Sequence, residues 1–468
     1  MRETVGDATP VGRPGRGRRP AARESILDAI RASEPLSRVE LAAKTGLTEA
    51  AVSMTVRRLL EEGLVVETGR APTGGKPRTL LRLDPAARLA VGVHLDRDVT
   101  TFVLTGQTGG VISRLARPAP PGDLLSHLTD GIGTLLAASG VDRARCLGLG
   151  VVWPGPRNGG ARRPRDTDAT PVGPSPSGRP GTPRFSAGPE ATPHATPPAP
   201  DSATGGPRVR LAPGATPHGS AAPQPPGPDT LPHLRGWDAD AFGRRLAEET
   251  GWPVLVENDA TAAAVGEYWV ARVGPEQAFA ALYMGSGIGA GIVVEGRAMR
   301  GSHGAAGEFG HVCVQVDGPE CWCGGHGCLE ILAGPRTVVA AARADASAAA
   351  EAGLDPAARR SVTADFAAVA RAARAGGPRC LSLLEDSARY VAAAAESVVN
   401  LLDIDLVVLT GPGFAAASFV YGPAIMRRVQ PANSRTWHRS ATVTVSLAAA
   451  TASATGAAAL ILQSHLRR

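Results

Sequence analysis

The feature that most constrains the fold is a run of low-complexity sequence near the middle of the chain. Residues 157–230 consist mainly of proline, glycine, threonine, serine, alanine and arginine, and they contain almost no apolar side chains large enough to build a core. Such a segment cannot bury enough apolar surface to offset the entropy that it would lose on ordering. We therefore expect a disordered insertion, and the folded parts must be assembled from the sequence on its two sides.

Length and composition exclude several classes of protein. A chain of 468 residues is too long for one ordinary core and predicts two or three domains. It contains no uncharged apolar stretch of membrane-spanning length, and its first residues are rich in arginine, glycine and proline rather than apolar. We therefore expect neither a transmembrane helix nor a secretory signal, and a cytoplasmic protein is the default. Six cysteines in so long a chain do not predict a disulfide scaffold.

The positive charge is concentrated at the N-terminal end. Residues 1–23 carry six arginines against two acidic residues, and residues 24–83 carry nine basic residues against eight acidic ones. Five of the six excess positive charges therefore lie in the first 83 residues. A basic tail on a nearly neutral body favours a polyanionic partner such as nucleic acid. The alternative is the general arginine enrichment of a GC-rich genome.

Residues 24–83 have the pattern of a winged helix-turn-helix domain. Ser37 followed by Glu40 predicts a capping box at the start of a helix, and Thr48 is a suitable cap for the next helix. The apolar spacing predicts three helices and then two strands joined by a Gly/Pro-rich loop. Their expected bounds are 24–32, 37–46, 48–62, 64–67 and 79–83.

The third helix of this domain is the candidate recognition helix. Its apolar residues fall on one side, which leaves a polar side that can enter a major groove of double-stranded DNA. The loop before the second strand supplies basic residues for a wing that contacts the phosphate backbone. The candidate DNA-binding residues are Thr48, Glu49, Ser53, Arg57, Lys76 and Arg78. A three-helix domain that binds proteins is the alternative.

The remaining sequence alternates strand-like and helical segments on both sides of the insertion, which is typical of an α/β fold. We expect the first part of this body at 89–156 and the remainder at 231–468. Strands are expected at 89–95, 100–104, 146–153, 254–257 and 406–410, and helices at 124–138, 335–373 and 380–402.

A dense group of cysteine and histidine residues predicts a metal site. The candidate ligands are His311, Cys321, Cys323 and Cys328, within a loop at 308–330. Three thiolates and one imidazole suit tetrahedral Zn²⁺, and a complete set of four ligands is typical of a structural rather than a catalytic site. Cys313 and His326 are competing ligands that the sequence leaves open, and free cysteines in a loop are the alternative.

Two further motifs lie next to apolar strands. Glu257-Asn-Asp-Ala260 follows directly after a strand, where α/β sheets place ligands, and an aspartate there can accept a proton or a hydrogen bond from a hydroxyl group. Met284 to Gly291 is a glycine-rich turn between strands, and it can hold a phosphate on backbone amides or be a simple hairpin.

Together these segments resemble the ROK family of repressors and sugar kinases, in its transcriptional-regulator branch. The most specific residues are Gly307-Glu-Phe-Gly-His311 followed by Cys321-Trp-Cys-Gly-Gly-His-Gly-Cys-Leu-Glu330. The segments Val256 to Asp259, Gly285 to Gly289 and Leu234 to Trp237 follow in the family's order, and Gly74-Gly-Lys-Pro77 resembles its wing.

The resemblance implies a winged helix joined to a two-lobed, actin-like sugar-kinase body of the ribonuclease H-like type with a structural zinc site. It also implies that a sugar is bound by Asn258, Asp259, Glu308, His311 and Glu330. His311 would contact both the zinc ion and the sugar. Asp259 matches the general base of the kinases.

One departure from the kinases decides the predicted function. The family's first phosphate motif, Asp-x-Gly-Gly-Thr, is replaced here by His94-Leu-Asp-Arg-Asp98. Phosphoryl transfer depends on positioning around the phosphates, so we expect no catalysis and a vestigial phosphate loop at Gly285, Ser286, Gly287 and Gly289. The sequence thus predicts a sugar-responsive, homodimeric repressor. An active ATP-dependent sugar kinase with a fused DNA-binding domain, or a DNA-binding protein with a vestigial sugar site, are the alternatives.

Overall fold

The computed structural model describes residues 21–71, 77–120, 122–155, 238–355, 357, 360–430 and 441–466. The expected insertion at 157–230, the basic tail up to residue 20, Lys76 and Leu234 to Trp237 lie outside the described residues. Among the helices that are described, none has both the length and the apolar character needed to cross a bilayer.

The N-terminal domain has the predicted order of three helices and a hairpin. These elements are α1 (Ala22–Ser33), α2 (Arg38–Thr45), α3 (Glu49–Glu61), β1 (Val65–Ala71) and β2 (Arg78–Leu83). The capping box is confirmed, because the Ser37 amide donates to Glu40 while the Ser37 hydroxyl accepts from the Glu40 amide. Val52, Val56 and Leu59 of α3 are fully buried in the domain's core. The winged helix-turn-helix is therefore held by its own hydrophobic core.

The first sheet of the body has the strand order β5-β4-β3-β6-β7. Strands β3, β4 and β5 form an antiparallel meander, whereas β6 and β7 run parallel to β3. The strands are β3 (Leu89–Leu95), β4 (Val99–Gly106), β5 (Val111–Pro118), β6 (Cys146–Trp153) and β7 (Val254–Asn258). The helices α4 (Leu124–Ser139) and α5 (Ala239–Thr250) pack against this sheet through a shared apolar core.

The second sheet repeats this topology, with the order β10-β9-β8-β11-β12. Its first three strands are again antiparallel neighbours, and β11 and β12 again run parallel to the central strand β8. The strands are β8 (Phe279–Met284), β9 (Ile288–Val294), β10 (Arg297–Ala298), β11 (Leu406–Thr410) and β12 (Thr442–Val445). Two sheets of equal order and direction are the two lobes of the predicted actin-like body.

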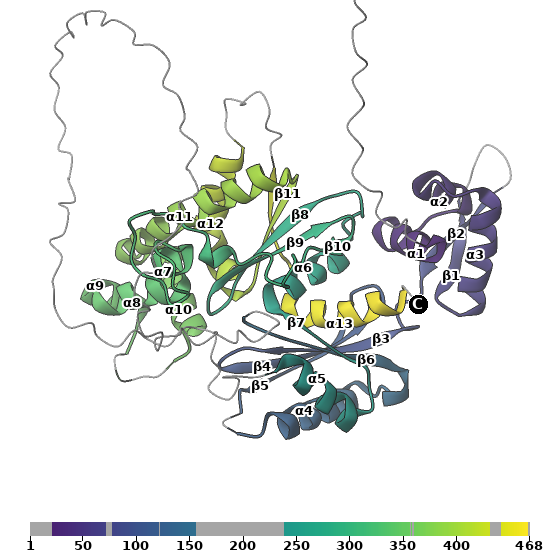
Figure 1. Cartoon of the computed structure of the whole chain (residues 1–468), viewed down its shortest axis with the longest axis horizontal. Helices are drawn as coiled ribbons and strands as arrows, with labels where there is room; N and C mark the ends of the chain where they lie inside the picture. Colours follow the sequence, from purple (N-terminus) through teal and green to yellow (C-terminus); the bar gives the residue numbers. More distant parts are fainter. Residues whose placement is uncertain are drawn as a thin grey trace, which may run out of the picture. The chain divides into compact units, whose positions relative to one another are not determined.

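Two helices lie between the sheets, α6 (Asp259–Val270) and α13 (Ala452–Leu466) (Figure 1). A single apolar cluster joins residues of both sheets with residues of both helices. The close packing requires glycine, because a Cβ on Gly456 of α13 would lie 1.6 Å from the carbonyl oxygen of Ala262 in α6. A Cβ on Gly92 of β3 would lie 1.9 Å from the carbonyl oxygen of Ala454. Both helices are therefore tightly packed between the two sheets.

The helical part of the second lobe differs from the sequence prediction in one place. A single helix over about 335–373 is wrong, since the structure has three, α8 (Pro335–Ala344), α9 (Ala346–Ala352) and α10 (Val362–Arg374). Asp345 ends α8 and accepts hydrogen bonds from two amides of α9, and Gly353 ends α9 with a left-handed φ of 59°. The second predicted helix is confirmed as α11 (Pro378–Leu402), which packs with α7 (Leu329–Ala333) and α12 (Pro412–Val429).

Candidate functional site

The end of β7 and the start of α6 form the centre of the candidate site. The Asn258 side chain caps α6 by accepting from the Thr261 amide, and it donates its own amide hydrogen to the carbonyl oxygen of Gly155, 3.0 Å away. Asp259 follows as the first residue of the helix and is 7% exposed, with Oδ1 bonded to the Ala260 amide at 2.8 Å. The junction therefore fixes Asp259, while the Asn258 amide is largely occupied by the protein itself.

A histidine from the first sheet faces Asp259. The Nε2 atom of His94, on β3, lies 3.6 Å from Oδ2 of Asp259, and both side chains are about nine-tenths buried. Burial opposes protonation of His94, but the attraction of the nearby Asp259 and Asp96 carboxylates outweighs it, so the pKa of His94 is raised. The ring also meets Tyr283 edge-on, with the ring centroids 6.3 Å apart. The pair favours an imidazolium next to the carboxylate.

The loop between β10 and the short 3₁₀ helix η3 (Phe309–His311) brings Glu308 to this region. Desolvation by the surrounding protein, and then the negative charge of Asp259, raise the pKa of Glu308, although solvent still reaches its side chain. Arg300 anchors the loop because its Nε donates to the buried Glu257 carboxylate on β7 at 2.6 Å. Glu308 and Asp259 thus interact electrostatically across two separate segments.

Glu330 supports the glycine-rich turn between β8 and β9. Its Oε2 accepts from the Ile288 amide at 2.8 Å, and a Cβ on Gly287 would lie 3.2 Å from its carboxylate oxygens. The predicted turn between two apolar strands is therefore confirmed, and the Glu330 carboxylate is hydrogen-bonded to the backbone where the turn ends. Glu330 was predicted to bind a sugar, but one of its two carboxylate oxygens already accepts this hydrogen bond from the backbone.

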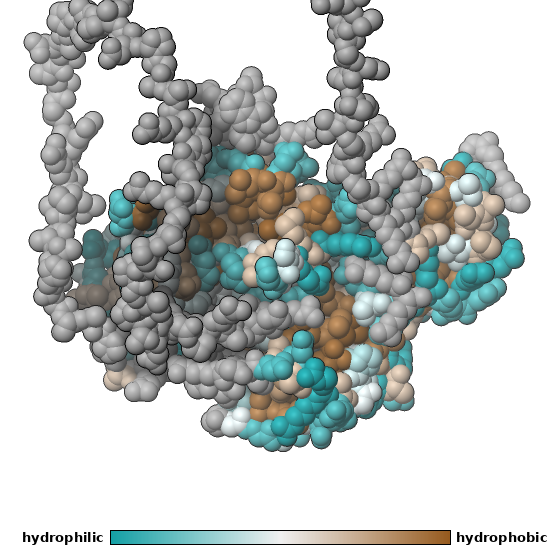
Figure 2. Space-filling model, viewed as in Figure 1, coloured by the Kyte–Doolittle hydropathy of each residue, from teal (hydrophilic) through white to brown (hydrophobic). Residues whose placement is uncertain are grey.

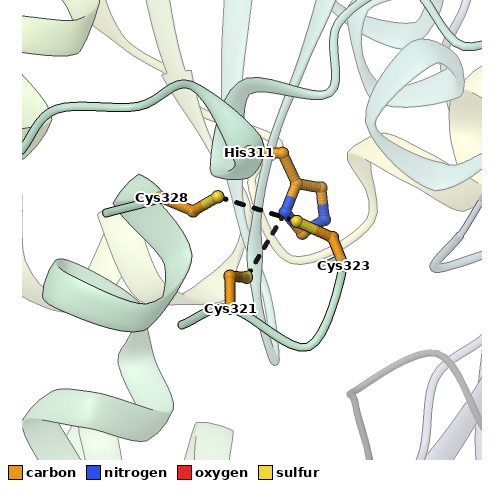
Figure 3. Close-up of side chains that lie close together, drawn as sticks. All are labelled: His311, Cys321, Cys323 and Cys328. Carbon is orange, nitrogen blue, oxygen red and sulfur yellow. Dashed lines mark hydrogen bonds between the residues drawn. The ribbon is translucent and has the colours of Figure 1, made fainter. Parts of the chain in front are cut away.

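The four predicted metal ligands converge on one point (Figure 3). One donor atom from each of His311, Cys321, Cys323 and Cys328 lies within 4.8 Å of all the others. The Nδ1 atom of His311 is 3.7 Å from Cys321 Sγ, and the sulfur atoms of Cys323 and Cys328 are also 3.7 Å apart. These side chains could hold a metal ion, and this grouping contains neither Cys313 nor His326.

The local backbone explains why the ligands converge. Gly324 and Gly327 have positive φ angles of 89° and 62°, and a Cβ on Gly327 would lie 1.7 Å from the carbonyl oxygen of Gln315. The Gly325 amide donates to the sulfur of Cys323 at 3.4 Å. Burial lowers the pKa of His311, which favours the neutral imidazole that a metal requires. We call the segment from His311 to Cys328 the metal loop.

The metal loop is joined to the Asp259 region through its first residue. The His311 amide donates to the carbonyl oxygen of Glu308 at 3.0 Å, so both residues belong to one tight turn. The ring of Trp322 meets the His311 ring edge-on, with centroids 4.7 Å apart, and fixes its orientation. A metal ion bound by the loop would therefore also fix Glu308 in place.

The polar side of α3 is the candidate DNA-binding surface. Glu49, Ser53 and Arg57 are exposed at intervals of four residues and share one face of the helix. Figure 2 shows hydrophilic residues beside apolar ones on the surface of this domain. The Thr48 hydroxyl is less available to DNA, because it already accepts a hydrogen bond from the Ala51 amide at 3.3 Å. Arg78 is exposed at the start of β2, next to the part of the wing that lies outside the described residues.

The structure also identifies residues that the sequence did not single out as part of the site. His94 stood out only as a departure from the phosphate motif, and its contact with Asp259 depends on the pairing of β3 with β6 and of β6 with β7. Arg300 lacked any sequence signal, because its partner Glu257 lies 43 residues away. Predicting either of these two contacts would have required knowledge of the sheet order.

Comparison with known proteins gives two family matches. Residues 230–464 match the ROK family, and residues 25–76 match the MarR family. The glucokinase of Thermotoga maritima is 30% identical over 192 residues, which covers 41% of this chain and 61% of that protein. The xylose repressor of Bacillus subtilis is 23% identical over 318 residues, covering 67% of this chain and 66% of the repressor. The chain thus spans about three fifths of the length of the glucokinase that it matches.

A solved structure resembles nearly the whole chain. The crystal structure of a ROK family transcriptional regulator, a homologue of the E. coli MLC protein, superposes with a TM-score of 0.61 at 20% identity and covers 96% of this chain and 98% of that one. This likeness confirms the fold, a winged helix joined to an actin-like body. Because the ROK match itself spans half of the chain, the protein belongs to the ROK family.

Proposed function

We propose that this protein is a sugar-responsive transcriptional repressor that binds double-stranded DNA as a homodimer. The observation that carries the proposal is the exposed polar face of α3, formed by Glu49, Ser53 and Arg57, in the same chain as a ROK body. Such a face on a winged helix fits a major groove, and a two-fold dimer fits a palindromic operator. The names of the xylose repressor and the MLC homologue are consistent with this role.

The sugar would bind where β7 meets α6. Asp259 and Glu308 offer carboxylate oxygens as acceptors for sugar hydroxyls, and His311 and Glu330 extend the site along the metal loop and the glycine-rich turn. Asn258 would contribute less than predicted, since its side chain already caps α6 and bonds to Gly155. Charge-assisted hydrogen bonds of this kind contribute about 1.5–3 kcal/mol each.

Two features of the same site argue against phosphoryl transfer. By the resemblance to the family, His94 would take the place of the aspartate in the kinases' first phosphate motif, and the residues after it form a tight turn in which the Asp96 amide donates to Val99. An imidazolium next to Asp259 would also compete with its use as a general base. These features support sensing without catalysis.

The metal would be a structural Zn²⁺ ion. Around a tetrahedral zinc ion, two sulfur ligands lie about 3.8 Å apart, and a sulfur and a nitrogen ligand lie about 3.6 Å apart. Two ligand pairs in the metal loop are 3.7 Å apart, and all four donor atoms lie within 4.8 Å of one another. Three sulfur atoms and one imidazole nitrogen are a soft donor set that suits zinc and leaves no open position for catalysis.

The test begins with DNA selection. The full-length protein is used to select binders from a pool of random duplexes, and the selected sequence is titrated in the presence of D-xylose, D-glucose and N-acetyl-D-mannosamine. We expect a two-fold symmetric site whose affinity changes with at least one sugar. Failure to enrich any sequence would contradict the DNA-binding role, and enrichment without any sugar effect would contradict the sensing role.

An active sugar kinase is the second candidate, and two observations favour it. Asp259, which the family resemblance matches to the kinases' general base, is the first residue of α6, and the relatives include glucokinases. An assay that couples ADP formation to the same three sugars separates the two functions. Turnover that the Asp259→Asn variant lacks would establish the kinase.

A further inference from the structure

One arginine of the winged helix is buried in the ROK body. Arg31, in the last turn of α1, is 2% exposed, and the winged helix and the body form one compact unit. Its guanidinium donates to the carbonyl oxygens of Tyr268 at 2.7 Å and of Val273 at 2.8 Å. It also lies over the Tyr268 ring, 3.9 Å from the centroid. Because Arg31 is buried and makes several polar contacts with the body, it forms a specific connection between the two domains rather than a surface contact.

The acceptor of this joint is the C-terminal end of α6. The last carbonyl groups of a helix lack partners within it and carry partial negative charge, so a cation there is favourable. Asp28, one turn before Arg31, completes the joint by pairing with Arg31 Nε at 2.9 Å and accepting from the Tyr268 hydroxyl at 2.9 Å. We call Asp28, Arg31 and Tyr268 the α1–α6 latch.

A second contact reaches the winged helix from the same turn of α6. Trp269 donates from its indole nitrogen to the carbonyl oxygen of Gln107 at 2.9 Å. The Gln107 side chain donates in turn to the carbonyl oxygen of Leu64 at 2.8 Å, just before β1. Apolar residues also meet at this junction, where Leu27 of α1 and Leu462 of α13 line one small pocket. The ion pair of Arg272 with Glu34 involves a partly exposed arginine and contributes less than a buried pair.

The other end of α6 carries the proposed sugar site. Asp259 is its first residue, and Tyr268 of the latch lies nine residues further along the helix, about 14 Å away. Every residue of α6 from Asp259 to Trp269 is buried, and Glu267 bonds to Thr410 of the second sheet at 2.7 Å. A helix packed on both lobes cannot bend freely, so a change in the position of the lobes moves it as one body.

We propose that the α1–α6 latch transmits the state of the sugar site to the DNA-binding domain. Sugar bound at Asp259 shifts α6 together with the lobes, and Arg31, seated on the last turn of α6, carries the shift to α1 and so repositions α3. The proposal rests on the proposed function. It assigns to Arg31 a role in coupling and none in contacting either ligand.

The test compares Arg31→Met with Arg23→Met in the full-length protein. Methionine keeps the apolar stem of the side chain and removes the donors to Tyr268 and Val273. Arg23 is a matched control, because it lies on the same helix and pairs only with Glu62 inside the winged helix among the described contacts. For each variant, the affinity for DNA is measured without sugar and with D-xylose or D-glucose, and the affinity for the sugar is measured separately.

We expect Arg31→Met to bind sugar and DNA and to lose the sugar effect on DNA affinity, while Arg23→Met keeps the parent's effect. Tyr268→Phe, which removes only the hydrogen bond to Asp28, should lose part of the effect and serves if Arg31→Met does not fold. A full sugar effect in both latch variants would overturn the proposal.

A second measurement needs no sugar and separates failure of the latch from failure of the proposed function. Hydrogen exchange should become at least about tenfold faster at the amides of α1 and at the end of α6 in Arg31→Met, and should stay unchanged in Arg23→Met. Unchanged exchange in Arg31→Met would overturn the latch even if neither sugar affects the parent. A parent that does not respond to sugar, with faster exchange in the variant, would contradict the sensing role and, with it, the transmission assigned to the latch.

Discussion

At the scale of single residues, the contact between His94 and Asp259 is the feature of the candidate site on which the proposal of sensing without catalysis most depends. The imidazole of His94, whose pKa is raised, lies 3.6 Å from the Asp259 carboxylate and occupies one side of it. The same contact keeps Asp259 fixed at the start of α6, which suits an acceptor for a sugar hydroxyl. The pair therefore favours binding over proton abstraction.

The raised pKa of His94 predicts a pH-dependent stability. The ion pair contributes fully below about pH 6.5, the ordinary value for histidine, and its contribution is lost as the pH rises through the raised pKa. The free energies of unfolding of the parent and of His94→Gln should therefore converge as the pH rises above 6.5, by about 1.4 kcal/mol for each unit by which the pKa is raised. Denaturant unfolding between pH 6 and pH 9 measures this. A difference that stays constant over this range would contradict the ion pair.

Asp259→Asn tests the sugar site directly. Loss of one charge-assisted hydrogen bond should weaken sugar binding by about 1.5–3 kcal/mol, or roughly tenfold to 100-fold, while DNA binding without sugar stays unchanged. Calorimetric titration with the sugar that acts on the parent measures the loss. Glu248→Gln, an exposed carboxylate on α5, is the control. Equal sugar affinity in the parent and in Asp259→Asn would place the sensor elsewhere.

At the scale of elements, the metal loop makes a sharp prediction about stoichiometry. The parent should contain about one zinc ion per chain, and Cys323→Ser should contain none and melt at a lower temperature, because binding to the native state alone stabilises it. Cys313→Ser is the matched control, since Cys313 is close in sequence and lies outside the four-ligand group. Metal analysis of the three proteins decides the matter, and a full complement of zinc in Cys323→Ser would refute the assignment.

A substitution in the recognition helix α3 should impair DNA binding without affecting sugar binding. Arg57→Ala should weaken DNA binding and lower the slope of log K against log salt by about 1, as expected for one lost phosphate contact, and sugar binding should stay intact. Arg371→Ala, an exposed arginine of α10 in the body, should bind DNA like the parent. Identical salt slopes for the parent and Arg57→Ala would exclude the contact between Arg57 and phosphate.

The helices of the winged helix were predicted well, because their capping residues and the spacing of their apolar residues indicated the same bounds. Ser37 with Glu40, and the buried face of α3, were readable because all the interacting residues lie within one or two turns. The break at Asp345 was missed because alanine favours a helix on both sides of it. That α8 packs against α10 follows from long-range contacts, a shared apolar core and the ion pair of Arg343 with Asp365. Propensity alone did not contain this information.

At the scale of the whole molecule, the parts that depend on long-range contacts were the ones that the sequence could not reveal. The ligands of the metal loop were predictable because they lie within 18 residues of one another. Arg31 gave no signal, since its acceptors Tyr268 and Val273 lie more than 230 residues along the chain. The family resemblance supplied the order of the lobes but not the joint between the winged helix and the body.

The composition of residues 157–230 predicts that they are dispensable. A deletion that joins the flanking segments through a short Gly/Ser linker should remain soluble and bind DNA as the parent does, because the entropy of closing a loop depends only weakly on its length. The deletion should keep Gly155, whose carbonyl oxygen accepts from Asn258. Aggregation of the shortened protein, or loss of DNA binding, would show that the segment belongs to a folded part.

The central claim is that sugar and DNA act on each other through one chain, and thermodynamic linkage tests it most directly. The sugar affinity is measured with and without saturating operator DNA, and the DNA affinity is measured with and without saturating sugar. The account predicts that the two ratios are equal, because coupling between two binding sites is reciprocal, and that they lie between about 5 and 150. A ratio of one in both directions would contradict the claim that this protein couples sugar binding to DNA binding.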